Sequence, residues 1–209
     1  MLQWNILMGL ISLYMYLYGA SGHGKVVKEI LDDAGIEVNA FIDDNLSLSN
    51  FFGLPVLHKA DGIEPIIVCV GKCDVRRQIV EHLNCRFATA IHSSAIISPS
   101  AKIGEGTVVM QGSVIQADVT IGKHCIVNTK ASIDHECEIE DFVHVAPGST
   151  ISGNVHIGSG TWVGAGTTVI QGIKIGKNCF IGAGSVIVKD VPDNTKGYGV
   201  PFKEIETLK

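Results

Sequence analysis

The sequence predicts an α/β unit of parallel strands followed by a parallel β-helix. Two patterns support this fold class. From residue 91 to residue 192 the chain divides into hexads that all begin with Ile or Val, without one slip of register. Before residue 84, short apolar runs alternate with segments of helical periodicity. A fixed six-residue period is typical of a β-helix, in which each repeat buries its apolar face against the repeats above and below.

The first part, residues 15–84, is expected to be a small Rossmann-like unit. The expected strands are 15–18, 38–42 and 65–70, and the expected helices are 26–33 and 74–83. Strands that alternate with helices form a parallel sheet. Residues 84–90 then lead into the second part, residues 91–209.

The hexads predict which side chains face outward. If three hexads form one coil, residues 18 apart stack in columns, and the sixth residue of each hexad points away from the axis. The outward columns are Lys102, Thr120, Glu138, His156 and Lys174; Ile96, Val114, Ser132, Thr150, Thr168 and Val186; and Val108, Ile126, His144, Trp162 and Phe180. The first is polar, but an apolar stripe such as the third should not remain exposed. We therefore expect neighbouring subunits to cover two faces, as in a trimer.

Composition excludes several classes of function. The chain has 209 residues, 46% of them hydrophobic and 18% charged, which is enough for one large or two small domains. A net charge of −5 gives no basic footprint, so nucleic acid is not an expected partner. Six cysteines occur without a C-x-x-C pair, and Cys125, Cys137 and Cys179 fill the small fifth place of their hexads. Buried, reduced thiols in a cytoplasmic protein are expected, without a zinc site or disulfide framework.

The first 18 residues are apolar, but they lack the features of a signal peptide. No Lys or Arg precedes Lys25, and Gln3, Asn5 and Ser12 interrupt a run that is already short for a membrane span. We expect no membrane span. Residues 1–14 are interpreted as an extension of unknown role.

A glycine-rich loop, Gly19–Lys25, follows the first expected strand. Its glycines at 19, 22 and 24 do not match the G-x-G-x-x-G fingerprint of dinucleotide-binding proteins. It matches G-x-x-x-x-G-K, but Val26 replaces the Ser or Thr that would reach magnesium, which argues against ATP hydrolysis. A strand, close-approach glycines and a helix N-terminus still favour an anion such as a diphosphate.

Acidic residues end the second expected strand. Asp43 and Asp44 lie where a carboxylate commonly accepts hydrogen bonds from ribose or sugar hydroxyl groups, which favours a nucleotide-sugar. Solvated turn residues are the alternative interpretation. Gly71, after the third strand, would bring backbone next to the same ligand.

Four segments together resemble a known family. GASGHGKVV, FIDDN, VGKCDVRRQI and the hexads are similar to the sialic-acid O-acetyltransferases and UDP-4-amino-sugar N-acetyltransferases, over nearly the whole chain after Met15. The resemblance implies a left-handed β-helix of triangular section, a homotrimer, and no metal. It also implies that the first domain binds a UDP-amino-sugar and that acetyl-CoA binds against the β-helix.

The resemblance assigns roles to individual residues. Sugar-nucleotide contacts are implied for Ser21, Gly22, His23, Asp43, Asp44 and Gly71. Acetyl-CoA contacts are implied for His144, Ala165 and Ala183. Catalysis is implied for His135 as general base, with Glu136 as its modulator. The ending Gly197-Tyr198-Gly199-Val200-Pro201 is similar to the Gly-x-Pro ending of the family.

The corners of the β-helix give these roles a physical basis. Pro147-Gly148, Ala165-Gly166 and Ala183-Gly184 stack at one corner, where small side chains leave a track for the thin pantetheine arm; glycine and alanine also simply suit tight turns. His135 lies at another corner, about 15 to 20 Å away along six extended residues. A site between subunits is therefore expected, with the His135 of one chain facing the track of the next.

The expected reaction is direct acetyl transfer. An imidazole suits proton removal from the attacking 4-amino group, and a neighbouring carboxylate stabilises the imidazolium. The oxyanion would be stabilised by a backbone N–H or by His144, which could instead hydrogen-bond the thioester carbonyl.

Two alternatives stay open. One is O-acetylation of sialic acid, against which the acidic pair Asp43 and Asp44 argues without deciding. The other is a zinc hydratase or a non-catalytic scaffold, although the spacing of His124, His135, His144 and His156 does not reproduce the ligand pattern of β-helical carbonic anhydrases. The sequence does not identify the sugar or the glycan pathway.

Overall fold

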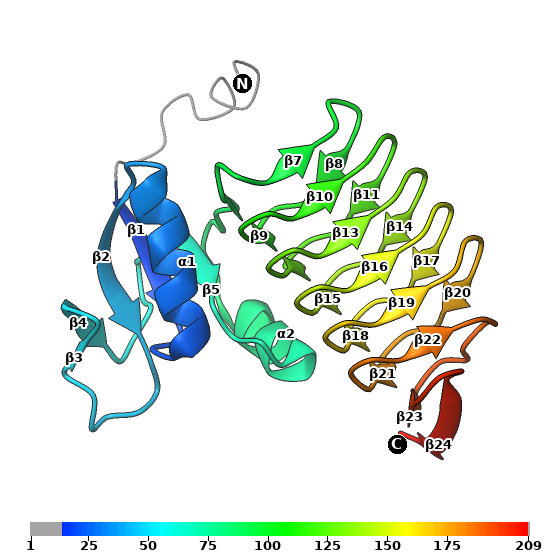
Figure 1. Ribbon diagram of the computed structural model, residues 1–209. Helices are drawn as coiled ribbons and strands as arrows, with labels where there is room; N and C mark the ends of the chain where they lie inside the picture. The colour runs from blue at the N-terminus through cyan, green and yellow to red at the C-terminus, as the bar shows by residue number, and fades with distance from the viewer. Residues whose placement is uncertain (1–13, 209) are drawn as a thin grey trace.

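The computed structural model describes residues 14–208 and contains two parts that pack side by side (Figure 1). An α/β unit is followed by a β-helix whose coils stack along one axis. The proposed extension, residues 1–14, lies almost entirely outside the described residues. Within residues 14–208, no helix is both long and apolar enough to cross a membrane.

The α/β unit is built on one mixed sheet. Its elements are β1 (Tyr14–Tyr18), α1 (Gly22–Asp33), β2 (Glu37–Ile42), β3 (Asn50–Phe51), β4 (Leu54–Leu57), β5 (Ile66–Val68) and α2 (Cys73–His82). The sheet order is β3-β4-β2-β1-β5, and β1 is parallel to both β2 and β5. The carboxyl ends of β1, β2 and β5 therefore meet at one edge, where ligands bind in open α/β sheets.

The expected helices and strands of this unit are confirmed, with shifted ends. Helix α1 begins at Gly22, four residues before the predicted start, because the glycine-rich loop already turns into helix after Ser21. The sequence prediction missed the hairpin of β3 and β4, which is only two and four residues long. Such short strands carry too little alternation of polar and apolar residues to be recognised.

The β-helix consists of three sheets whose strands are parallel, except that β24 is antiparallel to β23 in the third. The first contains β7 (Ile96–Ile97), β10 (Val114–Ile115), β13 (Ser132–Ile133), β16 (Thr150–Ile151), β19 (Thr168–Val169) and β22 (Val186–Ile187). The second contains β8 (Lys102–Ile103), β11 (Thr120–Ile121), β14 (Glu138–Ile139), β17 (His156–Ile157) and β20 (Lys174–Ile175). The third contains β6 (Ala90–Ile91), β9 (Val108–Val109), β12 (Ile126–Val127), β15 (His144–Val145), β18 (Trp162–Val163), β21 (Phe180–Ile181), β23 (Thr195–Tyr198) and β24 (Lys203–Thr207).

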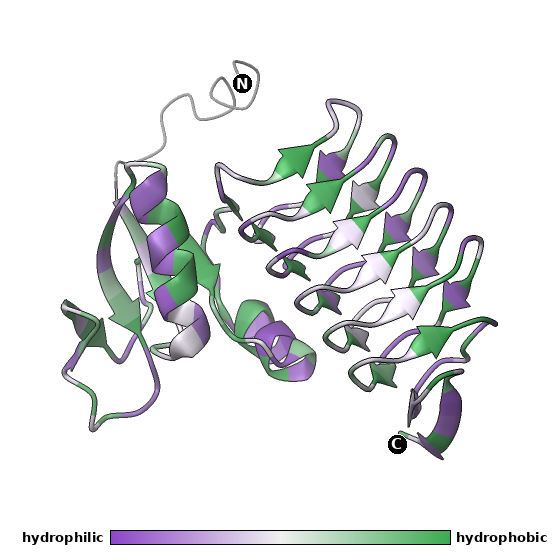
Figure 2. Cartoon of the chain, in the orientation of Figure 1, coloured by the Kyte–Doolittle hydropathy of each residue, from purple (hydrophilic) through white to green (hydrophobic). Residues whose placement is uncertain are grey.

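The predicted stacking at intervals of 18 residues is confirmed. Ser132 pairs with Val114 and Thr150, and Ile133 pairs with Ile115 and Ile151. The first residue of each hexad points inward: Ile133, Val145 and Ile151 are fully buried. The second sheet carries hydrophilic outward residues along its length, as predicted (Figure 2).

The fourth place of the hexads adopts left-handed backbone. Glycine or asparagine fills many of these turns, as at Gly148 and Asn154, because such residues tolerate a positive φ. Other side chains occur there as well, among them His124 (φ 52°), Lys130 (φ 56°), Glu136 (φ 59°) and Phe142 (φ 60°).

The prediction that a neighbouring subunit covers the third outward column is wrong for its first two residues, Val108 and Ile126. Val108 and Ile126 are each 1% exposed, and they share one apolar cluster with Met15 and Leu17 of β1. The α/β unit of the same chain therefore covers this part of the face. Periodicity reveals that a face is apolar, but it does not reveal what covers it. Lower in the column, Phe180 remains 43% exposed.

Candidate active site

The glycine-rich loop after β1 is shaped by close backbone contacts. Gly19 has a φ of 113°, and a Cβ atom on Gly24 would overlap the carbonyl group of Gly19. Ser21 precedes α1 but makes no side-chain capping bond. The first-turn N–H groups of α1 therefore remain available to a ligand, as a phosphate site requires.

The acidic pair after β2 holds this loop in place. Asp43 Oδ2 accepts a hydrogen bond from the N–H of Ala20 at 2.8 Å, and Asp44 Oδ1 accepts one from the hydroxyl group of Tyr18 at 2.7 Å. Burial, together with Asp44, raises the pKa of Tyr18 far above its ordinary value. The carboxylates are thus structural, while Asp43 stays partly exposed and Asp44 exposed, a combination that neither sequence interpretation contained.

His23, in the first turn of α1, is an unsatisfied polar group. Its Nε2 atom is inaccessible to solvent and has no hydrogen-bond partner within the described part of the chain. Burial, and then the charge of Arg76, lower its pKa to about 4. His23 is therefore a neutral ring with one buried nitrogen that no group within residues 14–208 satisfies.

His144, on β15, joins the two parts of the chain. Its Nδ1 atom lies 3.1 Å from the carbonyl oxygen of Gly71, and its Nε2 atom lies 3.0 Å from Nδ2 of Asn128. Asn128 Oδ1 accepts a hydrogen bond from the N–H of Thr129, which fixes the orientation of the amide. The partners assign a neutral ring with its proton on Nδ1, because a carbonyl only accepts and an amide nitrogen only donates. Burial accordingly lowers the pKa of His144 to about 3.

This tautomer bears on both roles considered for His144. The Nδ1 proton is donated to Gly71, and the Nε2 lone pair accepts from Asn128. In this arrangement the ring has no proton free for a thioester carbonyl or an oxyanion. Asn128, which the sequence analysis did not single out, lies between His144 and the start of the small-residue corner.

The small-residue corner is open to ligand. Pro147, Gly148, Ala165 and Gly166 are exposed, as are Ala183 and Gly184. A Cβ atom on Gly148, Gly166 or Gly184 would meet no other atom within 4 Å. We call this corner, from Asn128 to Gly184, the acyl track.

Backbone N–H groups are free along the acyl track. Within residues 14–208, the N–H groups of Ala165 and Ala183 donate to no protein acceptor. They are free to bind the amide carbonyl groups of an extended ligand. At a neighbouring corner the N–H of the third hexad place donates to a side chain, as Lys123 donates to Asp141 and Ser159 donates to Glu140. Within residues 14–208 the N–H groups of Ala117 and Gly153, on the corner of His135, also have no protein acceptor.

His135 lies on a different corner, between β13 and β14. Its Nδ1 atom is 3.1 Å from Glu136 Oε2, and the side chains are 56% and 66% exposed. The ring lies over Gly153, where any Cβ atom would collide with it. The hydrogen bonds of His135 within the described residues all stay on its own corner, so the pair faces outward from its own chain.

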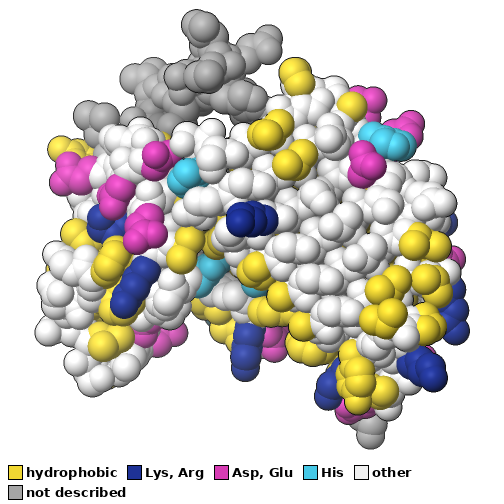
Figure 3. All heavy atoms as spheres, viewed as in Figure 1, with side chains coloured by type: hydrophobic (Ala, Val, Ile, Leu, Met, Phe, Trp, Pro, Cys, Tyr) yellow, Lys and Arg dark blue, Asp and Glu magenta, His cyan; other side chains and the backbone are white. Residues whose placement is uncertain are grey.

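The structure therefore brings together some predicted residues and separates others. His23, Gly71 and His144 meet where the α/β unit packs on the β-helix, and Figure 3 shows histidine side chains along this seam. His135 and Glu136 are on another corner of the same chain. This arrangement agrees with the expected separation of the base from the acyl track.

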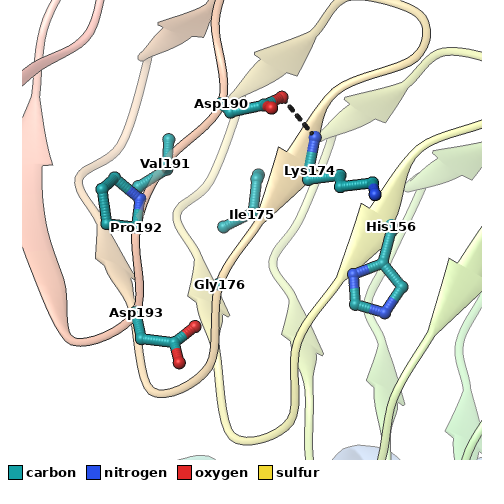
Figure 4. A pocket seen from close by; sticks show the side chains of 8 residues that line it. All are labelled: His156, Lys174, Ile175, Gly176, Asp190, Val191, Pro192 and Asp193. Atoms are coloured by element: carbon teal, nitrogen blue, oxygen red, sulfur yellow. Dashed lines mark hydrogen bonds between the residues drawn. The ribbon is translucent and has the colours of Figure 1, made fainter.

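A surface hollow of about 340 Å³ lies elsewhere, on the second sheet of the β-helix. Figure 4 shows its lining, including His156, Lys174, Asp190 and Asp193. Asp190 Oδ1 is occupied by the backbone N–H of Lys174 at 2.8 Å. The hollow contains none of the predicted site residues, so it is not the candidate active site. Within residues 14–208, no group of three His, Cys, Asp or Glu side chains is arranged to hold a metal ion.

Family models match both parts of the chain. Residues 15–83 match the PglD N-terminal domain, and residues 100–135 and 154–189 match the bacterial transferase hexapeptide repeats.

Solved structures resemble the chain along nearly its whole length. The acetyltransferase domain of PglB from Neisseria gonorrhoeae, in complex with acetyl coenzyme A, is 37% identical, with a TM-score of 0.88 over 93% of this chain and 100% of that one. PerB from Caulobacter crescentus, in complex with CoA and GDP-perosamine, is 34% identical, with a TM-score of 0.88 over 94% of this chain and 99% of that one.

Similarity to curated proteins is more local. UDP-N-acetylbacillosamine N-acetyltransferase of Bacillus subtilis is 38% identical over 107 residues, which are 45% of this chain and 50% of that enzyme. The chain spans between 25% and 50% of the length of the first curated relatives that it matches.

Proposed function

The chain belongs to the hexapeptide-repeat acetyltransferases that carry a PglD-type N-terminal domain, and we propose that it transfers an acetyl group from acetyl-CoA to the 4-amino group of a UDP-4-amino-4,6-dideoxy-sugar. One observation carries this proposal. The loop after β5, which is predicted to approach the nucleotide-sugar at Gly71, and the acyl track converge at His144, which contacts Gly71 on one side and Asn128 on the other.

The α/β unit would hold the nucleotide-sugar. The free N–H groups at the start of α1 suit the diphosphate, while Asp43 and Asp44 offer acceptors to hydroxyl groups. His23 Nε2 and the backbone at Gly71 would then face the amino-sugar. Relatives act on or bind both UDP-linked and GDP-linked amino-sugars. We favour UDP because UDP-N-acetylbacillosamine N-acetyltransferase is 38% identical, whereas PerB, solved with GDP-perosamine, is 34% identical.

The acyl track would hold acetyl-CoA. The N–H groups of Ala165 and Ala183 match the amide carbonyl groups of the pantetheine arm, which would end with its thioester beside Asn128. The neutral His144 would then line the acetyl pocket without donating a hydrogen bond to the acetyl group. Stabilisation of the oxyanion would therefore fall to a backbone N–H.

The general base would come from a neighbouring subunit of a homotrimer. The 4-amino nitrogen attacks the thioester carbonyl carbon, His135 of that subunit removes the proton, and CoA leaves as a thiol after protonation. Glu136, hydrogen-bonded to Nδ1 of His135, would orient the ring with Nε2 toward the amine. Acetyl-CoA is a cytoplasmic metabolite, so we place the reaction in the cytoplasm.

Release of free CoA tests this function. We expect turnover with UDP-4-amino-4,6-dideoxy-hexoses, weaker turnover with GDP-perosamine, and none with sialic acid. His135→Ala should reduce kcat about a hundredfold or more, as is usual for loss of a general base. His156→Ala is the matched control, because His156 is also a partly exposed histidine paired with a glutamate, on the second sheet. Preference for sialic acid, or near-normal activity of His135→Ala, would refute the proposal.

A further inference from the structure

Arg76, on α2, is a buried cation at the seam between the two parts of the chain. Its exposure is 1%, the lowest of any charged side chain within residues 14–208. Figure 1 shows α2 beside the β-helix. The proposed reaction gives this residue no role.

The guanidinium group binds backbone carbonyl groups from three segments. Nη1 donates to Val70 at 2.8 Å and to Gly71 at 2.9 Å. Nε donates to His124 at 2.8 Å, and Nη2 donates to Phe142 at 2.8 Å. One side chain therefore joins the loop after β5 to two successive coils of the β-helix.

These backbone carbonyl groups compensate the positive charge of Arg76, and no carboxylate of the described residues takes part. Arg76 forms no ion pair within residues 14–208. Burying a cation is costly unless all of its donors are satisfied, and the planar fork of arginine can reach several carbonyl groups at fixed angles. Lysine, with a single ammonium group, cannot reproduce this geometry. The arrangement therefore fixes positions with a precision that apolar packing alone would not give.

The carbonyl group of Gly71 is the point where this geometry reaches the site. It accepts from Arg76 Nη1 at 2.9 Å and from His144 Nδ1 at 3.1 Å, which uses both lone pairs of the oxygen. Arg76 thus holds the acceptor that keeps the proton of His144 on Nδ1. The same contact sets the distance between the loop after β5 and the β-helix at His144.

We propose that Arg76 is a positioning residue for acetyl transfer, which holds Gly71 and His144 in register so that the amino group of the sugar meets the thioester. This proposal rests on the proposed function. Each ligand would bind largely to one part of the chain, the sugar-nucleotide to the α/β unit and CoA to the β-helix. Arg76 controls how the two parts meet, and a displacement of about 1 Å between reacting groups can cost on the order of a hundredfold in rate.

Arg77 provides a matched control, since it is the next residue of the same helix at the same seam. Its Nη2 donates to Ser159 Oγ at 2.9 Å, and its guanidinium lies 5.1 Å from the centre of the Phe142 ring. It contacts neither Gly71 nor His144. Loss of Arg77 should therefore weaken the seam without changing the register of the site.

The test compares Arg76→Lys and Arg76→Gln with Arg77→Lys in the full-length chain. Calorimetry gives the affinity and the number of CoA sites, so that kcat is expressed per folded site. For both Arg76 variants we expect kcat to fall at least tenfold, while KM and Kd for CoA and for the UDP-sugar change less than threefold. Arg77→Lys should keep kcat within twofold. Equal kcat values per site in all three variants would overturn the proposal.

A second readout does not depend on turnover. Nitrogen-15 NMR of labelled histidine distinguishes a ring protonated on Nδ1 from one protonated on Nε2. The His144 signal, assigned with His144→Gln, should report an Nδ1 proton in the wild-type chain and in Arg77→Lys, and a mixture of tautomers in the Arg76 variants. If this pattern holds while no amino-sugar is acetylated, the proposed function fails and the positioning role survives. An unchanged His144 signal in both Arg76 variants would refute the positioning role.

Discussion

At the scale of single residues, Glu136 has a backbone conformation that its side chain does not favour. Its φ of 59° lies in the left-handed region, where the next coil of the same corner has Asn154. A non-glycine residue in such a conformation costs of order 1 kcal/mol and often marks a functional site. Because Glu136 also bonds His135, the strain and the proposed chemistry coincide at one position.

This coincidence predicts that stability and activity change in opposite directions in Glu136→Asn. Asparagine tolerates left-handed backbone, so the free energy of unfolding should rise by up to about 1 kcal/mol. CoA release should fall about tenfold, because His135 loses its carboxylate partner. Denaturant unfolding and the CoA assay measure the two effects.

Asp118→Asn serves as the control for this pair of effects. Asp118 occupies the same place one coil earlier, with a φ of 60°, and does not contact His135. It should keep full activity. A Glu136→Asn variant that is less stable than the wild-type chain would refute backbone strain at Glu136. Full activity of that variant would refute the role of Glu136 as modulator of His135.

Buried histidines predict how stability depends on pH. Burial lowers the pKa of His144 to about 3 and those of His23 and His124 to about 4, below the value of about 6.5 in an unfolded chain. The unfolded state therefore binds more protons below pH 6.5. Stability should be complete above that pH and fall towards pH 4, by up to about 1.4 kcal/mol per pH unit for each ring.

Urea unfolding between pH 8 and pH 5 measures this slope. His124→Asn should reduce it, since asparagine already fills the equivalent turns at Asn178 and Asn194. A stability that is constant over this range would contradict the assignment of neutral buried rings.

At the scale of elements, the acyl track combines small side chains with free N–H groups. Ala165 and Ala183 are exposed, and their N–H groups have no acceptor within residues 14–208. At a neighbouring corner, side chains of Asp141 and Glu140 cap the N–H groups of Lys123 and Ser159. The fold does not require this difference, because the capped turns adopt the same backbone.

A larger side chain in the acyl track should block CoA without disturbing the fold. Ala165→Leu places an apolar side chain on an exposed turn, so the melting temperature should change little. The Kd for CoA should rise at least tenfold, measured by calorimetry. Ala165→Ser, which adds a single atom, should bind CoA nearly as well as the wild-type chain. Equal CoA affinity of the leucine variant would exclude this corner as the binding site.

The sequence predicted most elements for one physical reason: they are encoded locally. The hexads define the coils, since each buries its own Ile or Val, and the helices are identified by their apolar periodicity. Contacts between distant segments were not predictable. Arg76 reads as a solvated helix residue beside Arg77, and His144 as an outward residue of a β-helix. Only docking of the α/β unit shows that both bind Gly71.

At the scale of the whole molecule, the proposed function requires two chains to complete one site. His135 faces away from the acyl track of its own chain, and the first-sheet face with Ile96, 67% exposed, has no cover within residues 14–208. The third face is partly covered by the α/β unit, which reduces the argument for a trimer from two apolar faces to one. Assembly and catalysis should therefore be tested together.

Mixing two inactive variants tests whether sites are shared between chains. His135→Ala supplies an intact acyl track and Ala165→Leu supplies an intact base. Random assembly into trimers from equal amounts restores about a quarter of the sites, because three quarters of the trimers are mixed and each has one complete site in three. Recovery of CoA release after joint refolding measures this fraction. Sites within single chains would give no recovery.

The stacked coils also act as a ruler. Neighbouring parallel strands are about 4.8 Å apart, so the three steps from Asn128 through Ala146 and Gly164 to Gly182 mark out about 14 Å. Length along this axis changes in whole coils, which have eighteen residues in the regular part of the β-helix and sixteen at its C-terminal end, where Phe180 pairs with Lys196. Insertion or deletion of one coil would therefore lengthen or shorten the acyl track by about 5 Å. The orientation of one end of the track relative to the other would be preserved.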